Sequence, residues 1–103
     1  MTEQEFRLRA DETLEDLQQQ LLPLADEADL EIDLRNGVLQ LVFEEPTPAK
    51  FVVSPNAPVQ QIWVSALSRS YKLSWSPRSA QFELDGETLD ALLARLVNQF
   101  LGN

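Results

Sequence analysis

The stretch "DLEIDLRNGVLQLVF", from Asp29 to Phe43, decides the fold because it has the pattern of a β-hairpin. Its first half alternates apolar and acidic residues, which is typical of a strand with one buried and one exposed face. The apolar members are Leu30, Ile32 and Leu34, and the acidic members are Asp29, Glu31 and Asp33. Asn36 and Gly37 then suit the positive φ angles of a two-residue turn. The stretch therefore predicts two antiparallel strands with one face toward a core.

Short strands separated by turn residues follow this hairpin. After a loop over residues 44–50, we expect strands at Phe51–Ser54, Gln60–Ala66, Ser70–Trp75 and Gln81–Leu84. Pro55, Asn56 and Pro58 are assigned to the turn between the first two of these strands. Connections of hairpin length indicate an antiparallel sheet of about six strands.

A long amphipathic helix is expected before the hairpin. Thr2 followed by Glu5 fits a capping box. Apolar residues then recur every three or four positions over residues 6–24, which is one stripe of a helix. Pro23 has no N–H to donate, so the helix is predicted to end or kink within about Gln20–Ala25.

A second amphipathic helix closes the chain, with Thr88 as the predicted N-cap and a close i, i+3, i+4, i+7 apolar pattern over residues 89–100. The predicted fold is α+β, in the order α-β-β-β-β-β-β-α. It is a two-layer αβ-sandwich whose two terminal helices pack on one face of the antiparallel sheet. Residues 1–103 are expected to form a single domain.

Composition narrows the possible functions. The 103 residues are 44% hydrophobic, with no apolar run long enough for a membrane span and no signal-peptide pattern at the start, so we expect a soluble cytoplasmic protein. The chain has no cysteine and no histidine. Disulfides, zinc fingers and catalysis by Ser–His or Cys–His pairs are therefore excluded, and an enzyme is not expected. Any metal site must use oxygen ligands, chiefly carboxylates.

The charge is uneven along the chain. The net charge is −9, and residues 1–45 carry 13 acidic residues against three arginines. Residues 46–103 carry four acidic residues against five bases. This balance argues against nucleic-acid binding and favours a basic protein partner or a cation.

Trp63 breaks the strand pattern. Within "QQIWVSA", Ile62, Val64 and Ala66 share the core side, so Trp63 must point to solvent beside Gln61 and Ser65. Tryptophan is a preferred anchor at interfaces. The alternative is that Trp63 only packs across the sheet, against Val42 or the stem of Lys72.

Several short motifs, in this order and spacing, carry a resemblance to a known family. They are Glu5-Phe6, Ala10-Asp11, "NGVL" (36–39), Phe43-Glu44, Pro58 with Gln61-Ile62-Trp63 and Ser65, Tyr71, and "DGETLDALL" (85–93). Across nearly its whole length the chain resembles the frataxin family, in its bacterial CyaY branch. The resemblance implies an αβ-sandwich that acts in iron–sulfur cluster assembly, binds a cysteine desulfurase and its scaffold protein, and binds iron weakly along an acidic ridge. We expect a monomer.

The resemblance implies partner contacts on the sheet. Gln61 and Trp63 match exposed family positions that contact the assembly machinery, and Lys72 is a minor contact. Asn56 lies in the preceding turn. Here the chain departs from the family's Asn-x-Gln pattern and has Ser54-Pro55-Asn56-Ala57-Pro58, so a polar turn is partly replaced by a stiffer one.

The resemblance also implies weak binding of iron, Fe²⁺ or Fe³⁺, by carboxylates of the first helix and first strand, with no tightly bound cofactor. The matching residues are Glu12, Glu15, Asp16, Asp26, Glu27, Asp29, Glu31 and Asp33. The neutral stretch "QQQLLP" (18–23) divides this ridge, where the family usually has several acids. Acids along a strand stand about 7 Å apart, too far for one octahedral site. We therefore favour docking of a basic partner over specific metal recognition. The alternative is an iron-storage or iron-donor protein.

Overall fold

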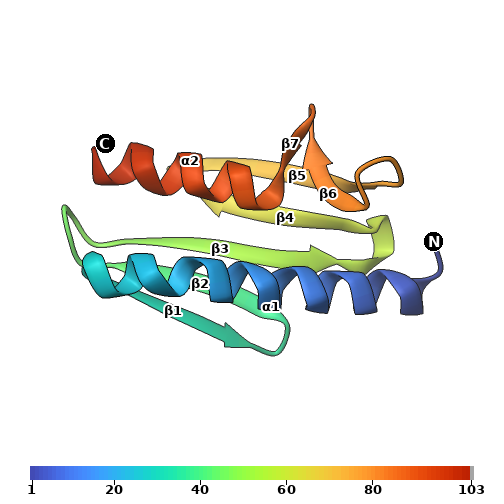
Figure 1. Cartoon of the computed structure of the whole chain (residues 1–103), viewed down its shortest axis with the longest axis horizontal. Coiled ribbons are helices and arrows are strands. Elements are labelled where there is room, and N and C mark those ends of the chain that lie inside the picture. The colour runs from blue at the N-terminus through green and yellow to red at the C-terminus, as the bar shows by residue number, and fades with distance from the viewer. Residues whose placement is uncertain (103) are drawn as a thin grey trace.

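A computed structural model describes residues 1–102, in which two helices and one seven-stranded antiparallel sheet form two layers (Figure 1). The elements are α1 (Glu3–Glu27), β1 (Leu30–Arg35), β2 (Val38–Phe43), β3 (Ala49–Asn56), β4 (Gln61–Ala66), β5 (Arg69–Ser76), β6 (Gln81–Leu84), β7 (Glu87–Thr88) and α2 (Leu89–Leu101). The strands are ordered β1 to β7 across the sheet. The predicted fold class is confirmed. The prediction lacked β7, a strand of only two residues paired with β6.

One face of the sheet is buried under both helices and the other is open. Buried and more exposed residues alternate along β2 and β4, as the period of two requires. The inward residues meet the apolar stripes of α1 and α2 in a single core. Phe43, Phe51 and Phe100 pack against one another there in tilted and edge-to-face arrangements, with ring centroids 4.7–5.8 Å apart.

The predicted hairpin is confirmed. Leu30 lies opposite Phe43, and Asn36 and Gly37 both have positive φ angles. Leu30 is buried, and Ile32 and Leu34 pack half-buried against the core. Their acidic neighbours therefore point to the open side of the sheet.

Of the two outcomes predicted at Pro23, an end or a kink of the helix, the end is wrong, because α1 continues to Glu27. Pro23 lies on the exposed side of the helix, so the carbonyl that it leaves without a donor can bind water. Leu21 is buried and Leu24 packs against the core. This packing on either side of Pro23 outweighs the local cost of the proline, since tertiary contacts supply most of the stability of a helix.

Pro55 and Asn56, predicted as turn residues, instead form the end of β3. Opposite residues of antiparallel strands alternate between hydrogen-bonded and non-hydrogen-bonded pairs. The hydrogen bond from Glu44 N–H to the Asp29 carbonyl identifies one bonded pair, and the register then shows which residues of β1, β2 and β3 point their N–H and C=O groups at one another. In that alternation the nitrogen of Pro55 faces β2, which begins only at Val38 and has no residue paired with it. The missing N–H therefore costs no ladder hydrogen bond.

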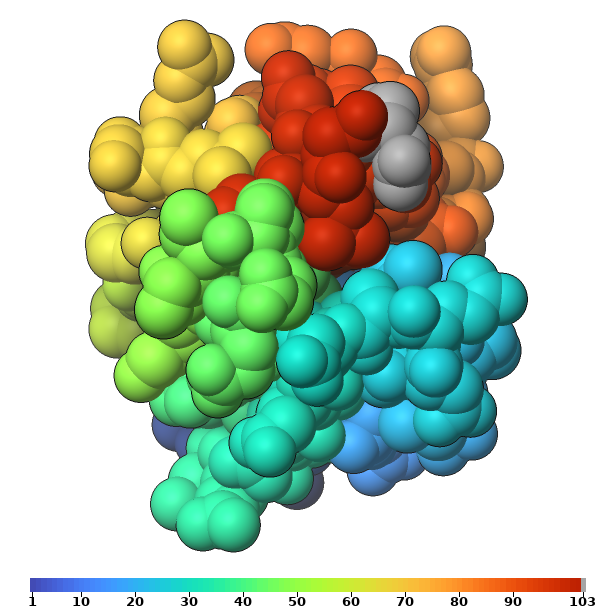
Figure 2. Space-filling model, turned by 90° about the vertical axis from the view of Figure 1, so that its left-hand side faces the viewer, coloured from blue at the N-terminus to red at the C-terminus, as the bar shows by residue number. Residues whose placement is uncertain are grey.

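Three segments meet at one end of the molecule: the end of α1, the loop between β2 and β3, and the end of α2. Figure 2 looks onto this end, with the end of α1 in cyan, the loop in green and α2 in red.

No helix among residues 1–102 is long and apolar enough to cross a membrane.

Candidate functional site

Trp63 lies on the open face of the sheet, in the middle of β4, and is 37% exposed. It stands opposite Ser54 of β3 and Lys72 of β5. Its indole Nε1 donates a 3.0 Å hydrogen bond to Oε1 of Gln61, and Nζ of Lys72 lies 4.9 Å from the ring centroid. These two contacts fix the orientation of the ring, which leaves a large apolar surface preorganised toward solvent.

The neighbours of Trp63 decide between the two packing partners suggested by the sequence. Lys72 covers the ring as predicted. Val42 does not, because it lies opposite Lys50, and β3 separates its strand from β4. A shallow hollow of about 370 Å³ adjoins the ring, lined on the open face by Val52, Ser54, Ser65, Ser70 and Lys72. A side chain of a partner would find both apolar and hydroxyl contacts there.

The remaining predicted contacts lie on the same face. Gln61 is directly opposite Asn56 on β3 and Ser74 on β5. Its amide donates to Ser74 Oγ at 3.4 Å while its carbonyl oxygen holds Trp63. Asn56, Gln61, Trp63 and Lys72 therefore form one continuous surface over three adjacent strands, which we call the tryptophan face.

The acidic residues of β1 lie on this open side too, at the edge of the sheet. Glu31 is opposite Val42 and Asp33 opposite Gln40. At about 4.8 Å per strand, three strand spacings put β1 roughly 14 Å from β4, within the reach of one partner. Asp33 is not a free charge, because Arg35 Nε binds its Oδ1 at 3.1 Å. Glu31 is exposed.

A second group of acids gathers at the end shown in Figure 2. Asp26, Glu27 and Asp29 are exposed there, and Glu44 lies directly across from Asp29 through the backbone bond of 3.2 Å. Glu44 is not among the acidic site residues predicted from the sequence. The hairpin register was the signal that could have found it, because extending the pairing of Leu30 with Phe43 by one residue joins Asp29 to Glu44.

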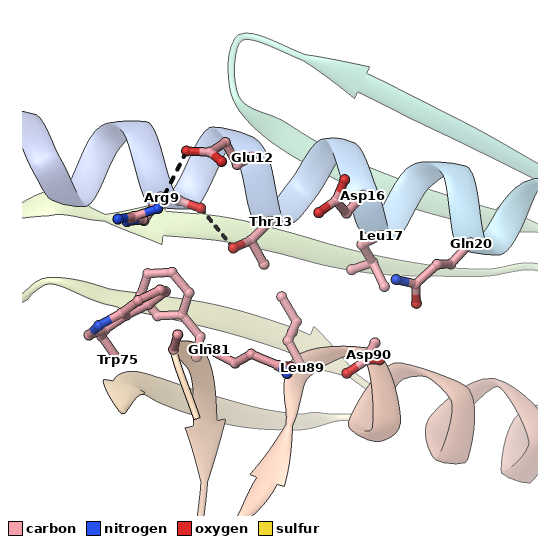
Figure 3. A pocket seen from close by; sticks show the side chains of 12 residues that line it. Arg9, Glu12, Thr13, Asp16, Leu17, Gln20, Trp75, Gln81, Leu89 and Asp90 are labelled. Carbon is pink, nitrogen blue, oxygen red and sulfur yellow. Dashed lines mark hydrogen bonds and ion pairs between the residues drawn. The ribbon is translucent and has the colours of Figure 1, made fainter. Parts of the chain in front are cut away.

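The acids of α1 are divided between different surroundings. Glu12 and Asp16 line a groove of about 340 Å³ between α1, β5, β6 and the start of α2, and Asp90 lines it from α2 (Figure 3). Glu15 does not line this groove. Seven of the eight predicted metal ligands, all but Glu15, thus occupy the groove, the end of the molecule and the sheet edge, rather than one ridge.

The donor chemistry of these residues fits a hard cation, but their arrangement does not build a closed site. Within residues 1–102, no three histidine, cysteine or acidic residues are grouped so that they could hold one metal ion. Tight octahedral coordination needs several carboxylates converging on one point. The geometry therefore fits exposed carboxylates that each meet a hydrated ion or a partner's cationic group.

Comparisons with known proteins agree with the fold. A family profile described as "Frataxin-like domain" matches residues 1–103. An iron-sulfur cluster assembly protein CyaY of Janthinobacterium sp. (strain Marseille) is 34% identical over 101 residues, covering 96% of this chain and 89% of the relative. The protein of the same name from Pseudomonas aeruginosa is 39% identical over 83 residues, covering 77% of this chain and 75% of the relative.

A solved frataxin from Psychromonas ingrahamii, studied as a model of stability modulation within the CyaY family, superposes with a TM-score of 0.78. The match covers 96% of this chain and 90% of that chain, at 19% sequence identity. This likeness supports the arrangement of helices and sheet.

Proposed function

Since the chain belongs to the frataxin-like family, we propose that it is a non-enzymatic regulator of iron–sulfur cluster assembly, acting in the bacterial cytoplasm on a cysteine desulfurase and its scaffold protein. The names of its relatives support the assembly role. The composition supports a binding role, because a chain without histidine and cysteine has no Ser–His or Cys–His pair for catalysis.

The observation that carries this proposal is the tryptophan face. Trp63 is partly exposed and its orientation is held by Gln61 and Lys72, so it has the chemistry of an interface anchor. The acidic edge of β1 and the acidic end would attract a basic surface of the partner. Such attraction raises the association rate and orients the encounter.

The test is calorimetric titration of the desulfurase with the Trp63→Ala variant. We expect the affinity to fall by about tenfold to several hundredfold, since truncating an aromatic anchor costs about 1–4 kcal/mol. Leu8→Ala is the matched control, because Leu8 is 57% exposed and lies on α1, away from the open face. Equal affinity for the wild type and Trp63→Ala, with the fold intact, would refute the proposed contact.

Iron binding is part of the proposal only as weak binding by exposed carboxylates. A titration with Fe²⁺ under anaerobic conditions, repeated in the presence of Mg²⁺ or Ca²⁺, measures it. We expect these ions to compete at comparable concentrations, because no three acids are grouped around one point within residues 1–102. A defined stoichiometry in the low micromolar range that resists such competition, and that is lost when Asp29 and Asp33 become asparagine, would favour storage or delivery of iron.

A further inference from the structure

The groove between the two helices has no role in the function proposed above. It is about 340 Å³ in volume, within the usual range of about 300–1,000 Å³ for ligand sites. Leu17 and Leu89 form an apolar part of its wall. Asp16 of α1 and Asp90 of α2 stand on either side of this apolar part, as Figure 3 shows.

The end of the groove away from α2 already holds the guanidinium group of an arginine of this chain. Arg9 lies over the ring of Trp75, 5.6 Å from the centroid, and its Nη1 is 3.9 Å from a carboxylate oxygen of Glu12. Trp75 packs edge-to-face against Phe82, with 5.2 Å between the ring centroids. One aromatic ring and one carboxylate thus accommodate an arginine belonging to the chain itself.

The end nearer α2 has the acids without the arginine. Neither Asp16 nor Asp90 takes part in an ion pair with any residue of the described part of the chain. The hydroxyl of Thr88 donates to Asp90, which orients that carboxylate. Gln20 and Gln81 add amide oxygens that can accept further hydrogen bonds.

We propose that this groove binds an arginine side chain of a basic protein partner, with its guanidinium between Asp16 and Asp90 and its aliphatic stem against Leu17 and Leu89. Charge complementarity supports arginine, because two carboxylates on separate helices can each accept hydrogen bonds from one planar guanidinium. A metal ion is less suited, since no third acidic, histidine or cysteine ligand completes such a site within residues 1–102.

The inference adds a contact for the basic partner of the proposed function and in that respect rests on it. The groove lies on the helix layer, whereas the tryptophan face lies on the open side of the sheet. Variants at Trp63 and at Asp16 with Asp90 can therefore test the two surfaces independently.

The test is an NMR titration of the ¹⁵N-labelled protein with the peptide acetyl-Ala-Arg-Ala-amide. We expect shifts concentrated on the backbone amides of Asp16, Leu17, Leu89 and Asp90. The same peptide with citrulline, which has the shape of arginine but no charge, should produce no such shifts. Shifts spread over β1 and the acidic end, or equal shifts with citrulline, would overturn the proposal.

Matched variants separate the groove from general acidity. Asp16→Asn with Asp90→Asn should weaken peptide binding by about tenfold or more, because two charge-assisted hydrogen bonds are replaced by neutral ones. Asp29→Asn with Glu31→Gln removes the same charge elsewhere and should change binding less than about twofold. If the double groove variant is unstable, Asp16→Asn alone serves, because Asp16 is exposed in mid-helix. If the peptide does not bind the groove, the contact proposed for Trp63 is unaffected. If Trp63→Ala loses desulfurase binding, the proposal for the groove is unaffected.

Discussion

Arg95 and Glu87 form an ion pair with two hydrogen bonds on the surface of this molecule. Arg95 of α2 binds Glu87 of β7 through two hydrogen bonds, Nε to Oε2 and Nη2 to Oε1, each 2.9 Å long. The bonds from Arg95 lower the pKa of the Glu87 carboxyl below its ordinary value of 4.5, and the bonds to Glu87 raise the pKa of Arg95. The pair ties the two-residue strand β7 to the helix that follows it.

The lowered pKa predicts how this pair contributes to stability at different pH values. A carboxyl whose pKa is depressed by folding stabilises the native state above its unfolded pKa, and this contribution disappears as the pH falls through the folded pKa. We therefore expect Glu87→Gln to be less stable than the wild type in urea at pH 7, and the difference to shrink in acid below the ordinary value of 4.5. Asp85→Asn, an exposed neighbour outside the four ion pairs of residues 1–102, is the control and should show no such dependence. A difference that grows toward low pH would contradict the assignment.

At the scale of elements, local patterns predicted those parts whose own residues decide their structure. The β1–β2 hairpin follows from alternation and from Asn36-Gly37, and α2 follows from its apolar repeat. The outward position of Trp63 follows from the same period of two. Residue type alone was less reliable for predicting the end of α1 at Pro23 and a turn at Pro55. The cost of a proline in a helix or strand depends on where its missing N–H would point in the folded chain.

The groove could not be predicted for a different reason. It joins Asp16 and Asp90, which are 74 positions apart in the sequence, across two helices whose spacing only the folded sheet determines. Periodicity assigns Asp90 to a solvated helix face, and Asp90 is indeed exposed. Periodicity gives no information about which residues of other elements lie near it. The tryptophan face was accessible to sequence reasoning because it lies on adjacent strands.

Replacing Pro23 tests the explanation given for α1. Pro23→Ala restores a helical N–H at an exposed position, and we expect the free energy of unfolding to rise by about 1–3 kcal/mol. The gain is smaller than the full cost of a proline in a helix, because alanine also gives the unfolded chain more freedom. Chemical denaturation measures the change. A Gln19→Ala variant, at an exposed position about one helical turn before Pro23, controls for helix propensity alone. Unchanged or reduced stability in Pro23→Ala would mean that the last turn contributes little.

On the scale of the whole molecule, the uneven charge of the sequence becomes an uneven charge in space. The acidic half of the chain forms α1, β1, β2 and the start of the following loop, while the nearly neutral half forms β3 to α2. Because α1 packs over β1, β2 and β3, most of the negative charge is concentrated in the lateral half of the sandwich that these elements form, on both of its layers. The charge that would attract a basic partner therefore also repels itself in the free protein.

This self-repulsion predicts that salt stabilises the protein. Raising NaCl from about 0.01 M to about 1 M shortens the Debye length from roughly 30 Å to 3 Å, so we expect the melting temperature to rise by several degrees. Two triple variants test where the repulsion lies. Asp29→Asn, Glu31→Gln and Glu44→Gln together should reduce the salt dependence clearly, because these acids lie close together at the sheet edge and the acidic end.

The matched triple, Glu83→Gln, Asp85→Asn and Asp90→Asn, removes the same charge from the nearly neutral half and should leave most of the salt dependence in place. Equal effects of the two triples would show that only the net charge matters, and a melting temperature that falls with salt would contradict the repulsion itself. A strong difference would locate the repulsion at the acidic edge, where a basic partner would relieve it on binding. The energy released there would then add to the contacts made by Trp63.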